Sequence, residues 1–286
     1  MRIAVVTDST AYLPGGYAER YSVRTVPLHV SVDGAETVVE SEFGPDDLTS
    51  AFASKRRVTT SGATSQELAT VYRDALDSGA DGVVSVHLSR QLSATWDAAR
   101  LAASDVDPDR VHVVDSRSTG MGLGFAVLAA AERALAGAGL AEVEASAVAT
   151  AERTTTMFSV PTLDYLRRGG RIGTAAAVLG TALAIKPLLH VHDGKIEALE
   201  KVRTTGRAMS RLLEISVRSV GSEPVSIAVH HLAAPERAEQ LGEQIRRRLP
   251  DCRDCVISEV GAVIGAHIGP GAVGVVLLSG GWRPDA

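Results

Sequence analysis

The sequence predicts a two-domain α/β protein: an N-terminal three-layer domain on a parallel sheet, followed by a C-terminal α/β domain with a mixed sheet. Its 286 residues suit roughly two domains of about 150 residues each. In the first half, valine-rich runs without polar alternation are separated by helical patterns, as in parallel strands buried on both faces. In the second half, a hairpin signal breaks this rhythm. We place the boundary near Thr154, which gives domains 1–154 and 155–286.

The first half reads as strands alternating with helices. The expected strands are 3–7, 23–32, 83–88 and 111–114. The expected helices are 45–53, where Pro45 suits a first turn, 65–77 and 92–103. An alanine-rich stretch from 116 to 153 is interrupted at Gly137 and Gly139, which predicts two helices joined by a short turn.

The second half begins with an expected strand, 154–160, and a short helix opened by Pro161. The segment RRGGRIG at 167–173 is then expected to form a tight loop. Asp193-Gly194 lies between runs 187–192 and 195–202 and predicts a β-hairpin. The remaining pattern predicts, in order, helix 205–220, strand 225–229, helix 235–249 and strands 255–260 and 273–278.

Composition narrows the class of protein. A hydrophobic content of 45% and a net charge of −5 are typical of a globular protein and argue against a nucleic-acid binder. The initial apolar run stops at Asp8 and is too short for a signal peptide, so we expect a cytoplasmic location. The weakly polar stretch 172–185 is shorter than a membrane span.

Hydroxyl side chains gather where the predicted parallel strands end. Asp8, Ser9 and Thr10 follow the first strand, Ser89, Ser93 and Thr95 follow the third, Ser116, Ser118 and Thr119 follow the fourth, and Thr60 and Ser61 precede the helix at 65–77. Each alone reads as a helix cap or turn residue. Together at one sheet edge they suit an oxyanion or carboxylate held by neutral donors.

Two further candidates stand among glycines. His267 lies in an otherwise apolar segment, 261–271, where a Gly-Pro-Gly turn would present its ring near a surface crevice; the alternative is a structural histidine. Arg171 is flanked by glycines that would let its guanidinium approach an anion closely; the alternative is a solvated surface arginine.

The other motifs in the sequence do not indicate a cofactor or metal site. The glycines at 120–124 have the wrong spacing for a dinucleotide loop, and the chain has neither a phosphate-binding P-loop nor a Gly-x-Ser-x-Gly elbow. Cys252 and Cys255 have metal-like spacing but lack a second pair of ligands. We therefore expect no cofactor and no metal.

Seven segments occur in the order seen in DegV-family proteins, and the chain resembles that family over nearly its whole length. They are DSTAYLP at 8–14, TS at 60–61, SRQLSAT at 89–95, DS at 115–116, LDYLRRGGRIG at 163–173, KPLL at 186–189 and GAHIGPG at 265–271. Departures from the family pattern are Ala94 for glycine, Trp96 for tyrosine and Gly62-Ala63 for Gln-Pro.

The resemblance implies a two-domain protein that binds one long-chain fatty acid between its domains. It implies an acyl-carrying subunit of bacterial fatty acid kinase, not itself an enzyme, which presents the carboxylate to a separate ATP-binding kinase subunit. By resemblance, Thr60, Ser61, Ser93 and His267 hold the carboxylate, and Arg171 faces the kinase or the developing acyl phosphate. Transient contact with a membrane would serve lipid exchange, and segment 175–185 would line the lipid tunnel.

Two alternatives stay open. One is a small-ligand phosphotransferase subunit or a hydrolase using His267 and Asp8, because dihydroxyacetone-kinase substrate subunits share a related architecture and hold their ligand through a histidine. The other is a regulatory binding module without a kinase partner.

Overall fold

The computed structural model describes residues 1–173, 175, 186–220, 223–249 and 251–283. The chain forms two compact units. The first unit comprises Met1–His29, Ser61–Arg153 and, among the described residues, Trp282 and Arg283; the second comprises Val30–Thr60 and Thr154–Gly281. The chain passes from one unit to the other after Arg153, close to the expected boundary at Thr154. The units differ from the expected contiguous halves, because residues 30–60 belong with the second unit.

The first unit contains the expected parallel sheet, in the order β2-β1-β6-β7. Its strands are β1 (Ile3–Asp8), β2 (Val23–Val26), β6 (Gly82–His87) and β7 (Val111–Asp115), and all three pairings are parallel. The strand expected at 23–32 is interrupted, because Pro27, which has no backbone N–H to donate, follows β2 and the next strand starts at His29.

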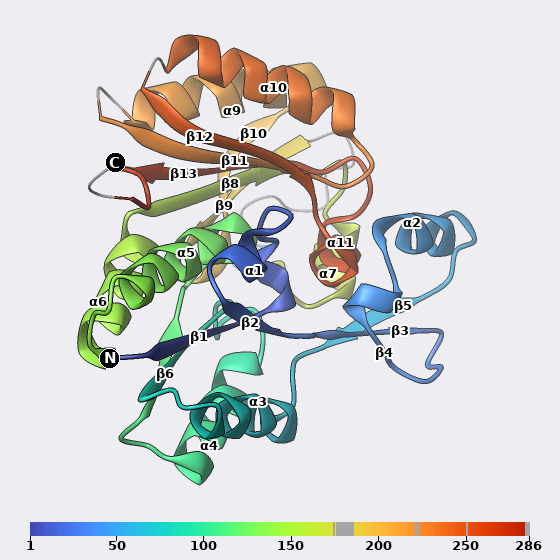
Figure 1. Cartoon of the computed structure of the whole chain (residues 1–286). Helices are drawn as coiled ribbons and strands as arrows, with labels where there is room; N and C mark the ends of the chain where they lie inside the picture. The colour runs from blue at the N-terminus through green and yellow to red at the C-terminus, as the bar shows by residue number, and fades with distance from the viewer. Residues whose placement is uncertain (174, 176–185, 221–222, 250, 284–286) are drawn as a thin grey trace. The chain divides into compact units, whose positions relative to one another are not determined.

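Helices cover both faces of this sheet and complete a three-layer unit (Figure 1). They are α1 (Tyr17–Arg20), α3 (Ser65–Asp77), α4 (Thr95–Val106), α5 (Met121–Leu135) and α6 (Leu140–Glu152). Helix α3 begins with a capping box, in which Thr64 and Glu67 bond each other's backbone N–H groups. Helices α5 and α6 form the expected pair, joined by a turn in which Gly137 adopts φ +82°.

The second unit is built on a six-stranded mixed sheet, in the order β10-β9-β8-β13-β11-β12. Its strands are β8 (Thr154–Ser159), β9 (Lys186–His192), β10 (Lys195–Val202), β11 (Val225–His231), β12 (Cys252–Glu259) and β13 (Val273–Ser279). Only the β11–β12 pairing is parallel. The predicted hairpin is confirmed, since Asp193 and Gly194 both adopt positive φ between β9 and β10.

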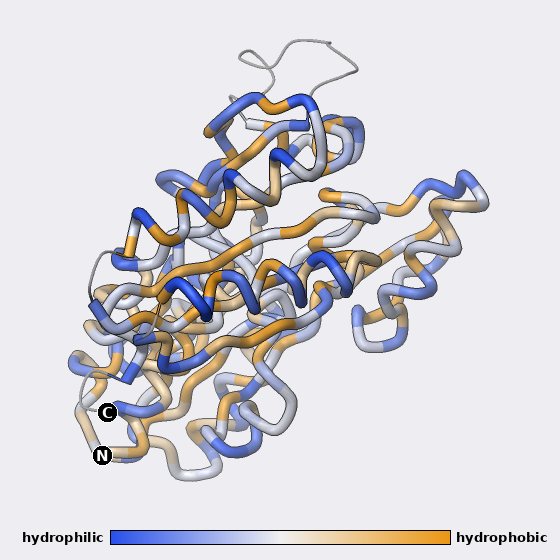
Figure 2. Tube along the Cα trace, turned by 90° about the horizontal axis from the view of Figure 1, so that it is seen from above, coloured by the Kyte–Doolittle hydropathy of each residue, from blue (hydrophilic) through white to orange (hydrophobic). Residues whose placement is uncertain are grey.

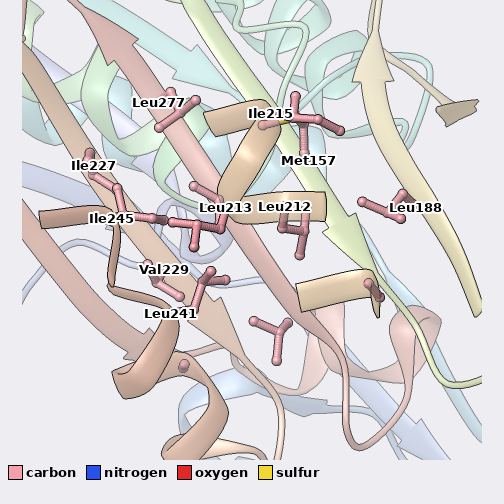
Figure 3. Packing of buried hydrophobic residues seen from close by; sticks show 14 of the residues in the cluster. Met157, Leu188, Leu212, Leu213, Ile215, Ile227, Val229, Leu241, Ile245 and Leu277 are labelled. Carbon is pink, nitrogen blue, oxygen red and sulfur yellow. The ribbon is translucent and has the colours of Figure 1, made fainter. Parts of the chain in front are cut away.

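Helices α9 (Thr205–Val220) and α10 (Pro235–Arg248) pack on one face of this sheet. Leu212 and Leu213 of α9 and Leu241 and Ile245 of α10 are buried against strand residues such as Ile227 (Figure 3). Along the chain, hydrophilic and hydrophobic residues alternate in the helices, as expected of amphipathic helices that cover a sheet (Figure 2). Their apolar faces form the core of the unit.

A smaller layer of the second unit carries the candidate site. Strands β3 (His29–Val32), β4 (Val38–Val39) and β5 (Val58–Ser61) form a three-stranded sheet, of which Val30–Thr60 belong to this unit, and α2 (Pro45–Ala53) connects β4 to β5. Helix α11 (Ala262–Ile268) packs against both α2 and α7 (Asp164–Arg168). No helix among the described residues is long and apolar enough to cross a bilayer.

Candidate functional site

The second unit has a cavity of about 590 Å³, within the usual size range of small-ligand sites. Three segments line it: the end of α2 with the following loop and β5, helix α7 with the loop after it, and the last turn of α11. The lining residues are Phe52, Lys55, Arg56, Arg57, Val58, Thr59, Thr60, Tyr165, Arg168, Gly169, Arg171, Ala266 and His267.

The charge around the cavity is positive. Five basic side chains line it and no carboxylate does among the described lining residues. Arg56 is partly neutralised, since its Nε lies 2.8 Å from Oδ2 of Asp33, and this hydrogen bond lowers the pKa of Asp33. The remaining positive charge favours a negatively charged ligand group.

One wall is aromatic. The rings of Phe52 and Tyr165 lie 4.7 Å apart between centroids, and the guanidinium of Arg168 lies 4.8 Å from the Tyr165 ring. The cavity therefore combines cations with an apolar surface, as an amphiphilic acid would require.

Thr60 and His267 meet in this cavity although they lie 207 residues apart in the sequence. Oγ1 of Thr60, at the end of β5, is 2.8 Å from Nε2 of His267 on α11. The sequence placed His267 on a Gly-Pro-Gly turn. That placement was wrong, because His267 lies in the last turn of a helix that ends before Gly269.

The imidazole of His267 is neutral near pH 7. Burial lowers its pKa to about 4, and the positive charge of Arg171 lowers the pKa in the same direction. A neutral ring carries one N–H, which must sit on either Nδ1 or Nε2.

The ring nitrogen opposite Thr60 is unpaired. Nδ1 is buried and has no hydrogen-bond partner among the described residues, so an N–H there would be an unsatisfied donor and a lone pair there an unsatisfied acceptor. The 2.8 Å hydrogen bond between Nε2 and Oγ1 of Thr60 can therefore run in either direction. In the Nε2–H tautomer the ring donates to Oγ1, and the hydroxyl proton of Thr60 is left to donate to another acceptor.

Two glycines of the 167–173 loop allow close packing, one against His267 and the other against the β9–β10 hairpin. A Cβ on Gly169 would lie 2.0 Å from Nδ1 of His267, and one on Gly173 would lie 2.3 Å from the carbonyl oxygen of Ile196. Arg171 bends back along the loop, where its guanidinium donates to the Gly169 carbonyl at 2.6 Å. Gly169 thus allows close packing of the His267 ring, and the expected close approach of Arg171 to an anion stays a prediction.

Glu40 holds the N-terminus of the helix that carries His267. Its buried carboxylate accepts the backbone N–H of Val263 at 2.8 Å across 223 residues of sequence. This bond ties the short 3-10 helix after β4 (Glu40–Glu42) to α11. It thereby fixes α11 within the layer that also carries Thr60.

The other two predicted carboxylate ligands, Ser61 and Ser93, belong to the first unit. Ser93 Oγ lies 2.9 Å from Oγ1 of Thr95 and accepts the Thr95 backbone N–H at 3.2 Å. This pair packs on Gly62, where a Cβ would lie 2.5 Å from Thr95 Oγ1. Gly62, a departure from the family pattern, is therefore a packing requirement of this loop.

The strand-end hydroxyls of the first unit do share one sheet edge, because β1, β6 and β7 are adjacent and parallel. Many of them are engaged locally. Ser9 accepts the N–H of Leu28, and Thr10 donates both its N–H and its hydroxyl to Asp8. The local turn and capping interpretation thus accounts for several members of this group.

Asp8 itself lies in a buried polar chain. Its carboxylate accepts from Leu88 N–H and lies 3.0 Å from Nδ1 of His87, whose Nε2 is 2.7 Å from Ser85 Oγ. Ser85 in turn bonds Tyr72 Oη at 2.8 Å, and the pKa of Tyr72 is raised by burial. Asp8 is fully buried, and these bonds hold the ends of β1 and β6 together.

Sequence reasoning missed several residues of the cavity. Lys55, Arg56 and Arg57 are consecutive in the sequence, and this run was the available signal for a cationic rim. Glu40 gave no local signal, since its partner is distant in the sequence. Segment 175–185, expected to line a tunnel, lies outside the described residues except for Ala175, which is buried.

The fold and the cavity together define a two-unit α/β protein with a pocket lined by cationic side chains on its second unit. The chain belongs to the DegV family, since the family model, described as "Uncharacterised protein, DegV family", matches residues 2–280.

Related proteins are similar to this chain over nearly its full length. A DegV domain-containing protein of Streptomyces coelicolor is 50% identical over 277 residues, 97% of this chain and 98% of that protein. Two solved structures are also similar. A DegV-family protein of Thermus thermophilus, reported for its fatty acid binding, is 35% identical with a TM-score of 0.91, covering 98% of this chain and 100% of that one. DegV of Bacillus subtilis, described as a fatty acid binding protein, is 33% identical with a TM-score of 0.89, covering 98% and 99%.

Proposed function

We propose that this protein binds a long-chain fatty acid in the cytoplasm and presents its carboxylate to a separate ATP-binding kinase subunit, which converts it to acyl phosphate. Two observations on relatives support the first half of this proposal: the Thermus thermophilus and Bacillus subtilis proteins are described as binding fatty acids. The kinase step rests on the family resemblance and on the chemistry of the cavity.

The observation that carries the proposal is the Thr60–His267 pair in a cationic cavity. With Nε2–H of His267 donating to Thr60, the threonine hydroxyl donates its own proton to a ligand oxygen. Such a neutral donor orients a carboxylate without locking it into an ion pair, so the carboxylate stays able to attack a γ-phosphate. In this arrangement Thr60 touches the ligand and His267 orients Thr60.

Affinity would come mostly from the acyl chain. About 16 methylenes at ~0.8 kcal/mol each give a gross gain of roughly 13 kcal/mol before ordering costs. Arg171 would act at a different stage, where negative charge develops on the transferred phosphoryl group. Ser61 and Ser93 are proposed as further carboxylate donors on the resemblance alone.

The first test is the lipid content of the purified full-length chain. We expect protein from a bacterial host to carry fatty acid without having been supplied any, measured by organic extraction and mass spectrometry. Folded protein that is free of lipid in quantitative yield would contradict the binding half of the proposal.

The second test compares two neighbouring threonines. Thr60→Val keeps the shape of the side chain but removes the proposed donor, and we expect fatty acid binding to weaken about tenfold, in line with a loss of 1–3 kcal/mol. Thr59→Val is the matched control, because Thr59 lines the same cavity with its hydroxyl directed to Ser31 O at 3.5 Å. Equal affinities of the two variants would show that Thr60 is not a ligand donor.

The kinase step is tested with Arg171→Ala in the presence of an ATP-binding fatty acid kinase subunit. We expect lipid content to change little and acyl-phosphate formation to fall sharply, because the lost charge acts on the phosphoryl group. If Arg171→Ala instead loses its lipid while turnover per bound lipid is unchanged, the assigned roles are reversed.

A further inference from the structure

Strand β12 of the second unit begins with the cysteine pair that the proposed function does not use. Between Val225 paired with Cys252 and Ser226 paired with Asp254, the register shifts by one residue, which makes Arg253 the extra residue of a β-bulge. Residues three apart in a regular strand point to opposite faces, and a bulge of one residue returns them to the same face. Cys252 and Cys255 accordingly pack against the same hydrophobic cluster, under α9 and α10.

The two thiols lie on one face of β12, where both are free and partly exposed. The S–H of Cys252 donates to the carbonyl oxygen of Asp254, 3.3 Å from Sγ. The positive charge of Arg246, in the last turn of α10, acts on both sulfurs.

We propose that Cys252 and Cys255 form a redox-active pair that closes to a disulfide on reaction with a hydroperoxide and reopens with a thiol reductant. Cys255 is the attacking thiolate: its sulfur bonds one peroxide oxygen, the O–O bond breaks, and the departing hydroxide takes up a proton as water. Cys252 then attacks the sulfur of the Cys255 sulfenic acid, and its proton leaves with the hydroxyl group as a second water. Two thiols are oxidised by two electrons while hydrogen peroxide is reduced to two waters.

The charges and polar groups around the pair decide which sulfur attacks. The neighbouring Cys252 thiol lowers the pKa of Cys255, and Arg246 acts in the same direction against the effect of burial. The neighbouring Cys255 raises the pKa of Cys252, which therefore keeps its proton and serves as the resolving thiol.

The location at a sheet edge makes closure feasible. Strand β12 is the last strand of its sheet and pairs only with β11 among the described strands. Cys252 is its first residue, next to the bulge. A disulfide needs Cα atoms within about 7 Å. A strand end with one unpaired side and a bulge can adjust its backbone to meet that limit at lower cost than a central strand.

The proposal is independent of lipid binding, because neither cysteine lines the cavity. We therefore expect Cys252→Ser/Cys255→Ser protein to retain fatty acid affinity within about twofold of wild type. A loss of lipid in that variant would argue against this separation and leave the fatty acid proposal itself untouched.

The test exposes the reduced full-length chain to a small molar excess of hydrogen peroxide. We expect the intact mass to fall by two hydrogen atoms, both thiols to disappear in a thiol titration, and dithiothreitol to restore both. In Cys252→Ser the reaction should stop at a sulfenic acid on Cys255 that dimedone traps. In Cys255→Ser peroxide consumption should slow by about fivefold or more, in keeping with the loss of the thiolate.

Arg246 provides a further control for the mechanism. Arg246→Gln should slow oxidation several-fold, whereas Arg247→Gln should not, because Arg247 is exposed and pairs with Glu243. Thermal unfolding of each variant checks that it is folded. Oxygen addition without loss of two hydrogens in wild type, or equal oxidation rates for the two single cysteine variants, would overturn the proposal.

Discussion

Replacing His267 by glutamine should remove a large part of the acid sensitivity of the folded protein. Glutamine places an amide nitrogen close to the position of Nε2, so the bond to Thr60 can be kept. The variant loses only the titration of the ring. This makes the pH dependence of stability, and not stability itself, the quantity to compare.

The direction in which pH changes stability follows from the difference between the pKa of His267 in the folded and the unfolded chain. In the unfolded chain His267 titrates near its ordinary pKa of 6.5, whereas burial and Arg171 lower the folded pKa to about 4. Between these values the unfolded state binds more protons, so stability is lost as the pH falls from 6.5 towards 4. From pH 7 to pH 5 the loss is about 2 kcal/mol, and it approaches roughly 3 kcal/mol at pH 4.

The assay is urea unfolding of wild type and His267→Gln at pH 7 and pH 5, supported by an NMR titration of the His267 ring. His230 is fully buried with its pKa also lowered to about 4, but it contributes equally to both proteins and cancels in the comparison. A His267 midpoint near 6.5, or the same pH dependence in His267→Gln as in wild type, would refute the argument that the ring is neutral.

Two other substitutions test how the loops are held. Glu40→Ala should lower the free energy of unfolding by about 2 kcal/mol in urea titrations, because Val263 N–H loses a charged acceptor, and Glu40→Gln should restore part of that loss. Glu42→Ala, at an exposed position, should change the free energy of unfolding by less than about 0.5 kcal/mol. Equal losses for Glu40→Ala and Glu42→Ala would argue against the bond between Glu40 and Val263. Gly62→Ala should lower the free energy of unfolding by about 1–3 kcal/mol, because its Cβ would lie 2.5 Å from Oγ1 of the buried Thr95. Gly15→Ala is the control and should leave stability unchanged, because a Cβ there would meet no atom within 4 Å. In thermal unfolding, an unchanged melting temperature for Gly62→Ala would contradict the close packing of this loop.

Elements with local boundary signals could be predicted from the sequence. Helix α3 starts where Thr64 and Glu67 form a capping box, α2 starts at Pro45, and the β9–β10 turn falls on Asp193-Gly194. These signals involve residues a few positions apart, so a single sequence contains them. The parallel and mixed sheets, the basis of the fold class, were predicted from valine-rich runs and the hairpin signal, which are also local features of the sequence.

Helix α11 shows why other features were missed. Its glycines suggest a turn, yet a Cβ on Gly265 would lie 2.5 Å from Cδ2 of Leu48, so this glycine serves close packing of α11 on α2. Such a contact joins residues more than 200 positions apart, and local patterns carry no trace of it. The membership of residues 30–60 in the second unit depends on the same kind of distant contact, including Glu40 with Val263.

The way the chain is divided between the units bears on how it folds during synthesis. The backbone crosses from one unit to the other four times, after His29, Thr60, Arg153 and Gly281. Trp282 is buried edge-on against Tyr21, and Arg283 donates to the hydroxyl of Tyr21 at 2.7 Å. Trp282 and Arg283 are synthesised after every residue of the second unit. The first unit therefore cannot form these contacts before the second unit has been translated, and no single cut in the chain would release either unit intact.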